Sequence, residues 1–299
     1  MMTRRFGRYA LLAFILVVAA ADGASAAAFR FVFMTDIHVM PERHAAEGFA
    51  AAIDRVNALA PDFVITGGDL VFDALEADYA RADSLYDLYI DLCGRFEMPV
   101  YNTIGNHEVF GLYPESGIEE THPEYGKEMF RRRLGGGATC RSFDYGGWHF
   151  ILLDTIGFTP ERRYEGRVAP ERLEWLARDL EAVDAGTPII LCLHIPLLSV
   201  YLQTKEGGSA GMAPAEAVIN SDEVIALFEG RDLRLVLQGH LHIVEQIAIR
   251  GTHFVTAGAV CGAWWKGPRD GFPEGFVVVD VDGDAFTYRY ETYRWQAGK

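Results

Sequence analysis

Aspartate, asparagine and histidine side chains follow five short apolar runs of this 299-residue sequence, each time where the run ends. The runs are rich in Val, Ile, Leu and Phe, which is typical of buried strands. The segments that follow them are Asp36-Ile37-His38, Gly67-Gly68-Asp69, Gly105-Asn106-His107-Glu108, His194 and Gly239-His240-Leu241-His242. Because the carboxyl ends of strands in an open α/β sheet meet at one edge, we expect these segments to lie together.

These residue types predict a site for divalent metal ions. Each segment alone is a weak signal, since a Gly-Gly-Asp more often marks a turn than a ligand. The joint pattern, always at strand ends, is specific. Carboxylate, amide and imidazole ligands without thiolate suit Mn, Fe or Zn. His240 and His242 alternate along an extended segment, so both side chains point the same way and can flank a metal pair.

The elements that must position these residues alternate between strands and helices. Apolar residues recur at helical spacing around residues 49–56, 85–92 and 173–183, and Pro170 suits the first turn of the last of these. Ser221, followed by two acidic residues, predicts the cap of a further helix. Strands are predicted at 29–35, 63–66, 100–103, 148–154, 188–194 and 234–238.

After residue 240 the pattern becomes rich in strands, at 243–250, 252–257, 276–281 and 285–290, joined by short turns. The sequence therefore predicts βαβ units followed by a C-terminal region that consists mainly of strands. No linker, repeat or low-complexity stretch divides it, so we expect a single domain over residues 27–299.

Composition narrows the function classes. Half of the residues are apolar, which supplies a full core and excludes a disordered chain. The formal charge of −15 argues against a protein that coats nucleic acid, which would need a basic face. A small anionic substrate is not excluded, because bound metal ions reverse the local field.

Residues 1–26 predict a secretory signal peptide. Three arginines precede an apolar run at 9–21, and Ala24-Ser25-Ala26 follows as a small-x-small cleavage site. The run is too short to span a membrane. We expect cleavage near Ala26 and a periplasmic or secreted protein that meets the membrane only during export.

The four cysteines of the mature chain match no zinc-binding spacing. Cys192 falls within an apolar run and is expected to be a small buried hydrophobe. An oxidising compartment permits a disulfide, but the sequence assigns no pairing. The four are Cys93, Cys140, Cys192 and Cys261.

Taken in order, the five polar segments resemble those of the calcineurin-like metallophosphoesterases, and the resemblance runs from Asp36 to the last strands. Three further segments are similar to the exported bacterial branch of that family: Tyr164-Glu165-Gly166, Trp175-Leu176 and Gly262-Ala263-Trp264-Trp265. The resemblance implies an α/β fold in which two mixed β-sheets pack face to face, flanked by helices. The metal site of this four-layer αββα sandwich lies at the carboxyl ends of the strands.

The resemblance also implies two divalent metal ions, of which Mn, Fe or Zn fit best. Asp36, His38, Asp69 and His242 would hold the first ion, and Asp69, Asn106, His194 and His240 the second. Asp69 would bridge the two, the role for which a carboxylate is best suited. Two ions in this arrangement lower the pKa of a bridging water and orient its attack on a small phosphate ester, either a monoester or a diester.

Two residues next to the ligands are implied to assist the reaction. His107 matches the family's non-ligand histidine, which stabilises the developing charge or protonates the leaving oxygen. Glu108 would orient His107 through a hydrogen bond. The remaining histidines have no recognisable partners and are expected at the surface or in the core: His44, His122, His149 and His253.

Trp264, Trp265 and Lys266 have two interpretations, core packing or a substrate wall beside the metals. Two adjacent indoles of an extended loop diverge, so we expect at least one to be partly exposed. Our hypothesis is that this loop binds the group attached to the phosphate, with Lys266 attracting an anionic substrate.

Three alternatives remain. The first is a catalytically inactive metal-binding protein of the same fold. The second is an acid-phosphatase-like phosphomonoesterase, although the purple type uses a tyrosine iron ligand where this sequence has Val71-Phe72. The third, a protein phosphatase, lacks a recognisable arginine clamp. The oligomeric state is not predicted.

Overall fold

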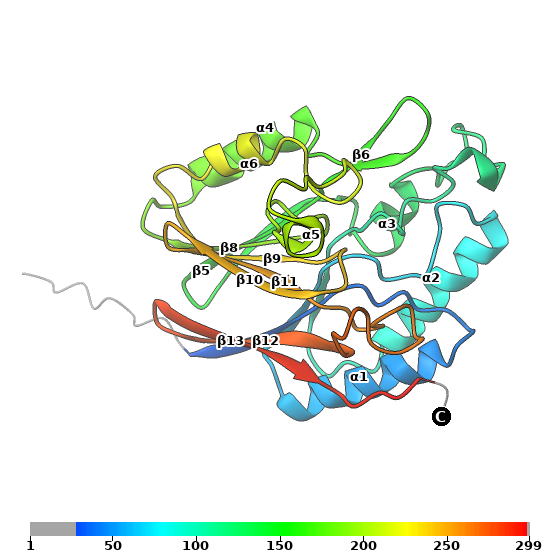
Figure 1. Ribbon diagram of the computed structural model, residues 1–299, viewed down its shortest axis with the longest axis horizontal. Helices are drawn as coiled ribbons and strands as arrows, with labels where there is room; N and C mark the ends of the chain where they lie inside the picture. Colours follow the sequence, from blue (N-terminus) through cyan, green and yellow to red (C-terminus); the bar gives the residue numbers. More distant parts are fainter. Residues whose placement is uncertain (1–27, 298–299) are drawn as a thin grey trace, which may run out of the picture.

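Two large β-sheets lie face to face at the centre of the computed structural model, which describes residues 28–297 (Figure 1). Helices cover the outer face of each sheet, so the molecule has four layers. The α/β sandwich implied by the sequence is thus confirmed. The expected signal peptide lies outside the described residues.

The first sheet has five strands in the order β13-β12-β1-β2-β3. Its three parallel strands are followed by the loops that carry the first three polar segments. The other two strands come from the end of the chain: β12 pairs antiparallel with β1, and β13 pairs antiparallel with β12 at the edge of the sheet. The bounds are β1 (Phe29–Met34), β2 (Phe63–Thr66), β3 (Val100–Asn102), β12 (Gly275–Asp282) and β13 (Ala285–Thr292).

The second sheet has six strands in the order β10-β11-β9-β8-β5-β4. Its four central strands are parallel, and the two edge strands run antiparallel to them. The bounds are β4 (Arg141–Tyr145), β5 (Trp148–Leu153), β8 (Pro188–Leu193), β9 (Asp232–Gln238), β10 (Val244–Ile249) and β11 (Thr252–Ala257). A separate hairpin joins β6 (Ile156–Phe158) and β7 (Tyr164–Gly166).

The helices divide between the two outer faces. α1 (Ala45–Leu59) and α2 (Tyr79–Cys93) cover the first sheet, and α4 (Pro170–Ala182) and α6 (Ser221–Ala226) cover the second. Shorter helical turns lie in the connections: η1 (Pro114–Ser116), α3 (Glu128–Arg133) and α5 (Tyr201–Glu206). None of the helices formed by residues 28–297 has both the length and the apolar character that a membrane span requires.

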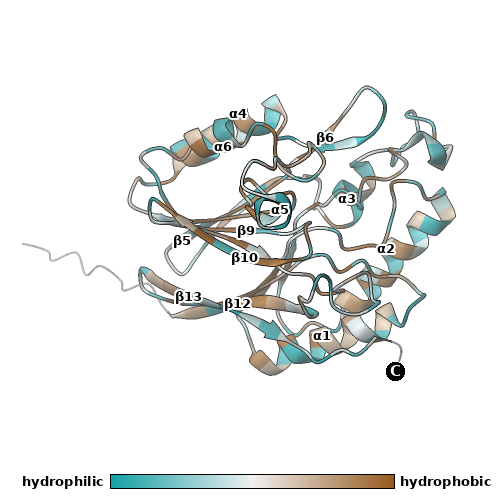
Figure 2. Cartoon of the chain, viewed as in Figure 1, coloured by the Kyte–Doolittle hydropathy of each residue, from teal (hydrophilic) through white to brown (hydrophobic). Residues whose placement is uncertain are grey.

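Aromatic residues fill the space between the sheets. Phe31 and Phe63 of the first sheet stack at 5.3 Å, and Phe150 of the second meets both rings edge-on. Such aromatic pairs add about 0.5–1.5 kcal/mol each beyond the area that they bury. The strands carry much of the hydrophobic colour in Figure 2, whereas the outer helices alternate hydrophobic and hydrophilic residues. This core between the sheets fixes the strand ends of one sheet relative to those of the other.

The structure differs from the sequence expectations in several places, among them the additional short helices η1, α3 and α5. Ser221 is the first helical residue of α6, and no side chain caps that helix. The short strands β4, β6 and β7 are additional, because their mixed polar sequences lack a clear strand period.

Three of the histidines expected to lack partners have them. His149 Nδ1 lies 2.6 Å from Asp144 and its Nε2 lies 2.9 Å from Asp179. His122 Nδ1 accepts from the amide of Glu124 at 3.1 Å, and His253 Nδ1 lies 3.1 Å from the Tyr288 hydroxyl.

The cysteines form no disulfide among the described residues. Cys192 lies buried in β8, as the sequence indicates. Cys261 is also buried, in the loop between β11 and β12.

Candidate metal centre

The five polar segments converge at the carboxyl ends of strands from both sheets. Backbone hydrogen bonds tie their loops to one another. The amide of Asp36 donates to Gly68, that of His38 to Asp69, and that of Gly239 to His194, at 2.8–3.0 Å. The site is therefore built by neighbouring loops that fix each other's course.

The backbone at this site is unusual. Five of the expected ligands have left-handed φ values of 46–73°, which non-glycine residues rarely adopt: Asp36, His38, Asp69, His240 and His242. Each such residue costs on the order of 1–3 kcal/mol and persists only where its surroundings enforce it. The loops thus carry strain at the residues whose side chains point inward.

Two glycines of the motifs make the close approach of these loops sterically feasible. A Cβ on Gly105 would lie 2.3 Å from the amide nitrogen of Asp69, and one on Gly239 would lie 2.1 Å from Thr35 Oγ1. Any side chain at either position would push the ligand loops apart.

One group of donor atoms surrounds a point between Asp36 and Asp69. His242 Nε2 lies 3.1 Å from Asp36 Oδ1 and 3.2 Å from His38 Nε2. His38 Nε2 in turn lies 3.4 Å from Asp69 Oδ2. All four residues are buried. These are the four that the sequence allots to the first metal.

A second group shares the same oxygen of Asp69. His194 Nε2 lies 3.2 Å from Asp69 Oδ2, 3.1 Å from Asn106 Oδ1 and 3.2 Å from His240 Nδ1. Asp69 Oδ2 therefore stands between His38 and His194, while Asp69 Oδ1 accepts from the amide of His107 at 3.0 Å. This is the position that a bridging carboxylate needs.

The outer nitrogens of three imidazoles are held by backbone carbonyls. His194 Nδ1 donates to Gly67 at 2.8 Å, His240 Nε2 to Ala215 at 2.8 Å, and His242 Nδ1 to Gly262 at 2.6 Å. Such bonds fix the tautomer and leave the inner nitrogen as a metal ligand. The spacing of inner donor atoms, near 3 Å, suits ligands about 2.0–2.2 Å from a shared cation. The residues present therefore fit two divalent ions.

The charges of the site are arranged in opposite pairs. Burial alone would raise the pKa of Asp69, but the nearby imidazoles, His194 first, hold that pKa well below its usual range. Burial opposes protonation of His194, yet Asp69 raises its pKa to about 9. The pKa of His242 is raised in the same way beside Asp36, whereas burial and His194 lower that of His240 to about 4. A metal ion that binds here would therefore have to displace protons from His194 and His242.

His107 lies beside this centre with a partly exposed side chain. Its Nε2 is 3.9 Å from Asp69 Oδ2, and its ring stands perpendicular to that of His38 at 4.6 Å. Its Nδ1 is buried and has no hydrogen-bond partner within the described chain. The side chain is near enough to a reacting group at the metals to act on it.

Glu108 differs from its expected role. Its carboxylate accepts four backbone hydrogen bonds at 2.7–3.1 Å, from Asp69, Leu70, Val71 and Gly105. The expected hydrogen bond to the His107 ring is not formed, because both oxygens face the loop after β2. Burial, with the charge of Asp69, raises the pKa of Glu108 to about 7. Glu108 therefore positions Asp69 rather than His107.

The three residues of the tryptophan loop separate. Trp264 is half-buried, with its ring 4.9 Å from that of His242 and 6.2 Å from that of His38. Trp265 is buried against Gly48 of α1, and its indole N–H donates to the carbonyl of His38 at 3.1 Å. It therefore cannot form a substrate wall. Lys266 is exposed. Of these three side chains, only that of Trp264 lies beside the imidazole rings of the expected ligands.

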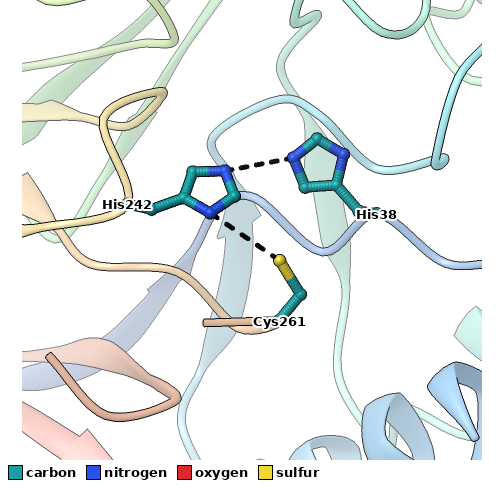
Figure 3. Close-up of side chains that lie close together, drawn as sticks. All are labelled: His38, His242 and Cys261. Carbon is teal, nitrogen blue, oxygen red and sulfur yellow. Dashed lines mark hydrogen bonds between the residues drawn. The ribbon is translucent and has the colours of Figure 1, made fainter. Parts of the chain in front are cut away.

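The sequence did not indicate Cys261, which lies beneath this centre. Figure 3 shows its thiol on the Nδ1 side of His242, at 3.9 Å, while His38 lies on the Nε2 side. His38, His242 and Cys261 are close enough to form a metal-binding group. Because Nδ1 of His242 donates to Gly262, however, the thiol is a neighbour of this ligand on the side away from Asp36.

Comparison with known families decides the relationship. The family model described as "Calcineurin-like phosphoesterase" matches residues 29–244, and that for the "C terminal of Calcineurin-like phosphoesterase" matches residues 255–298. The chain belongs to the calcineurin-like phosphoesterase family. The second match covers β12 and β13, the strands that complete the first sheet. Membership in this phosphoesterase family supports metal-dependent hydrolysis of phosphoesters as the general chemistry of the site.

Individual relatives are distant. Purple acid phosphatase 15 of Arabidopsis thaliana is 25% identical over 208 residues, which cover 62% of this chain and only 36% of that protein. A dimetal phosphatase from Danio rerio superposes with a TM-score of 0.64 at 13% identity, over 89% of this chain and 96% of its own. GAP50, "the anchor in the inner membrane complex of Plasmodium", reaches 0.58 at 15% identity, over 90% and 85%. The two structural likenesses establish the fold alone.

Proposed function

We propose that this protein hydrolyses small phosphate esters with two divalent metal ions. One observation carries the proposal: Asp69 Oδ2 stands 3.4 Å from His38 Nε2 and 3.2 Å from His194 Nε2. A single carboxylate oxygen between two sets of donors is what a binuclear site requires.

The residues divide the work by position. Bound ions would neutralise the phosphate oxygens and lower the pKa of an attacking water. Asp36, Asn106 and the histidine ligands would hold the ions through their inner oxygen and nitrogen atoms. Backbone carbonyls fix the outer nitrogens of His194, His240 and His242. His107 stands on the exposed side, where its Nε2 donates a proton to the leaving oxygen or stabilises the charge that develops there.

The test is a phosphoester panel on metal-stripped protein. p-Nitrophenyl phosphate, bis(p-nitrophenyl) phosphate and a cyclic phosphodiester are offered before and after Mn, Fe, Zn, Ni or Co is restored. We expect turnover only with metal, and the preferred ester defines the mono- or diesterase class. Metal uptake without turnover of any ester would favour the alternative of an inactive metal-binding protein.

The likeness to GAP50, which is described as an anchor, means only that the shared fold does not by itself establish catalysis. Against the inactive alternative, this chain retains His107 beside the complete ligand set. The other alternative, an acid phosphatase of the purple type, would need a tyrosine near the first metal. Phe72, whose ring is 6.4 Å from that of His38, has no hydroxyl to bind a metal.

We also propose that the protein acts outside the cytoplasm, as a member of the exported bacterial branch. The support is the N-terminal sequence, with its arginines, short apolar run and Ala24-Ser25-Ala26. Cys192 and Cys261 are buried and Cys93 and Cys140 are half-buried, so an oxidising compartment would leave at least the first two thiols out of reach.

A further inference from the structure

Two arginines far apart in the sequence lie at the Trp264 side of the metal centre. Arg43 comes from the segment before α1, and Arg269 from the loop between β11 and β12. Each touches a side chain that contacts the rings of the metal ligands. Neither belongs to the motifs that carry the proposed chemistry.

Arg43 spans two aromatic residues that flank His38. Its guanidinium lies 5.1 Å over the ring of Phe72, and its Nη1 donates to the carbonyl of Trp264 at 3.1 Å. Phe72 and Trp264 lie 6.4 Å and 6.2 Å from the His38 ring. Arg43 is therefore placed at the rim of the first metal position, with an exposed side chain.

Arg269 covers the ring of Trp264. Its guanidinium lies 4.9 Å from the indole centroid, and that ring lies 4.9 Å from the ring of His242. The Trp264 ring thus contacts the metal ligand His242 and also the guanidinium of Arg269. A small substrate whose phosphate is bound at the metals would be long enough to reach past Trp264 to Arg269.

The loop that carries Arg269 is anchored from the opposite side. Asp270 binds the hydroxyl of Tyr201 and, at 2.8 Å, the ammonium of Lys205, both from α5. Trp264 and Trp265 have left-handed φ values of 52° and 67°, which are rare for bulky residues. The loop is therefore held in a strained course that buries Trp265, places the Trp264 ring beside that of His242 and holds Arg269 over the Trp264 ring.

The positive charge at this rim is poorly neutralised. Arg43 and Lys266 form no ion pair within residues 28–297, and Arg269 reaches only Asp270, at 3.9 Å. The nearby carboxylates are engaged elsewhere: Glu42 pairs with Arg81, and Asp270 pairs with Lys205. In a chain of net charge −15, unneutralised cations beside a metal site favour an anionic ligand.

We propose that Arg43 and Arg269 form a second anion subsite, which binds a carboxylate or phosphate at the far end of a phosphoester whose reacting phosphate lies at the metals. The inference rests on the proposed function and narrows it to esters that carry two anionic groups. Guanidinium groups suit this task because their paired N–H donors match the oxygens of both oxyanions. Trp264 lies between the two anion positions and contacts the linking carbons.

The test measures binding of analogues that cannot be hydrolysed. 3-Phosphonopropionate and propylphosphonate have the same chain length and differ in a terminal carboxylate against a methyl group. 6-Phosphonohexanoate and hexylphosphonate repeat the comparison with a longer reach, and ethane-1,2-bisphosphonate replaces the carboxylate of 3-phosphonopropionate by a phosphonate. Titration calorimetry of the metal-loaded protein gives each dissociation constant without turnover.

We expect the doubly anionic member of at least one pair to bind about tenfold more tightly than its alkyl partner, the scale of one charge-assisted contact. The advantage should shrink as salt is raised. Arg269→Gln and Arg43→Gln should bring the ratio of the two constants toward one. Arg178→Gln, on the exposed face of α4, is the matched control and should leave the ratio unchanged.

Equal affinities within both pairs in the unaltered protein, or an advantage that survives both arginine substitutions, would overturn the second subsite. The affinity of the bisphosphonate relative to that of the phosphonocarboxylates shows whether the subsite prefers a phosphate-like group or a carboxylate. Failure of the proposed function has a different signature, because then the metal-loaded protein would hydrolyse none of the panel esters. A phosphoesterase without the subsite would hydrolyse esters yet bind the paired analogues equally.

Discussion

Asp69 is the residue on which both metal positions depend. Its Oδ2 faces ligands of both groups, and its Oδ1 is held by the amide of His107. Glu108 adds a third restraint by binding the Asp69 amide. A change at this single carboxylate should therefore affect two ions at once.

For Asp69→Asn we expect loss of most activity and of at least one metal per chain, because the substitution removes a charge that both ions share. Elemental analysis of the purified protein and the phosphoester assay check this. Asp54→Asn, on the exposed side of α1, is the control and should keep both. Full metal content with near-normal turnover in Asp69→Asn would contradict a binuclear site.

For His107→Ala we expect a rate lower by about 10²–10⁴, the usual contribution of a positioned acid or base, with about two metals still bound. The reason is that His107 Nε2 lies 3.9 Å from Asp69 Oδ2, farther away than the inner nitrogens of His38 and His194. His38, Asp69 and His107 are nevertheless close enough to one another to hold an ion, so the variant is a real test. Loss of a metal in this variant would make His107 a ligand instead. Rate and metal content must therefore be measured on the same preparation.

At the scale of elements, the sequence predicted the strands better than the loops between them. The bounds of β2 and β11 agree with the predicted runs at both ends, because their apolar composition identifies them. The sequence also predicted that the polar segments converge, because each of them follows the carboxyl end of a predicted strand. Strand positions depend mainly on the pattern of apolar residues, so they can be predicted from the sequence alone.

The loops contain details that the sequence could not show. The direction of Glu108 depends on the course of the β2 loop, where left-handed Asp69 turns the amides of residues 69–71 toward one carboxylate. The backbone carbonyls of Ala215 and Gly262 hold the outer nitrogens of His240 and His242. The sequence indicates neither contact, although Gly262 begins one of the segments that resemble the family. Backbone carbonyls have no sequence signature, and non-glycine left-handed residues are not announced by their type.

The tryptophan loop makes a prediction at this scale. Trp265→Ala should lower the melting temperature strongly, since deleting a buried indole costs about 3–5 kcal/mol. Trp264→Ala should instead change relative rates among aryl, nucleotide and glycerol esters by about tenfold, because its ring faces the metal ligands. Thermal unfolding and the ester panel separate the two. A uniform loss of rate with a lower melting temperature in both variants would make Trp264 structural as well.

At the scale of the whole molecule, the N-terminal sequence predicts export. We expect the mature protein from the native cell envelope to begin near Ala27, because Ala24-Ser25-Ala26 supplies the cleavage site. N-terminal sequencing of that fraction checks this. Intact Met1 on protein recovered from the cytosol would contradict export.

The metal centre also joins the two sheets. Asp36, Asp69 and Asn106 follow strands of the first sheet, whereas His194 and His240 follow strands of the second. A cation bound by both sets stabilises the folded state because the unfolded chain offers no such site. The inter-sheet contacts and the ions therefore stabilise the same arrangement.

Metal should consequently raise the melting temperature, and more at pH 8 than at pH 6. A ligand histidine must be neutral, but the raised pKa of His194, about 9, and that of His242 keep protons on both in the metal-free protein. Protons compete with metal less as pH rises, while the lowered pKa of Asp69 keeps that carboxylate charged throughout. Thermal unfolding with Zn or with a chelator at both pH values measures the shift, and Asp69→Asn should show a smaller one. An equal shift at the two pH values would mean that no imidazole proton is displaced, and that the ions bind somewhere other than His194 and His242.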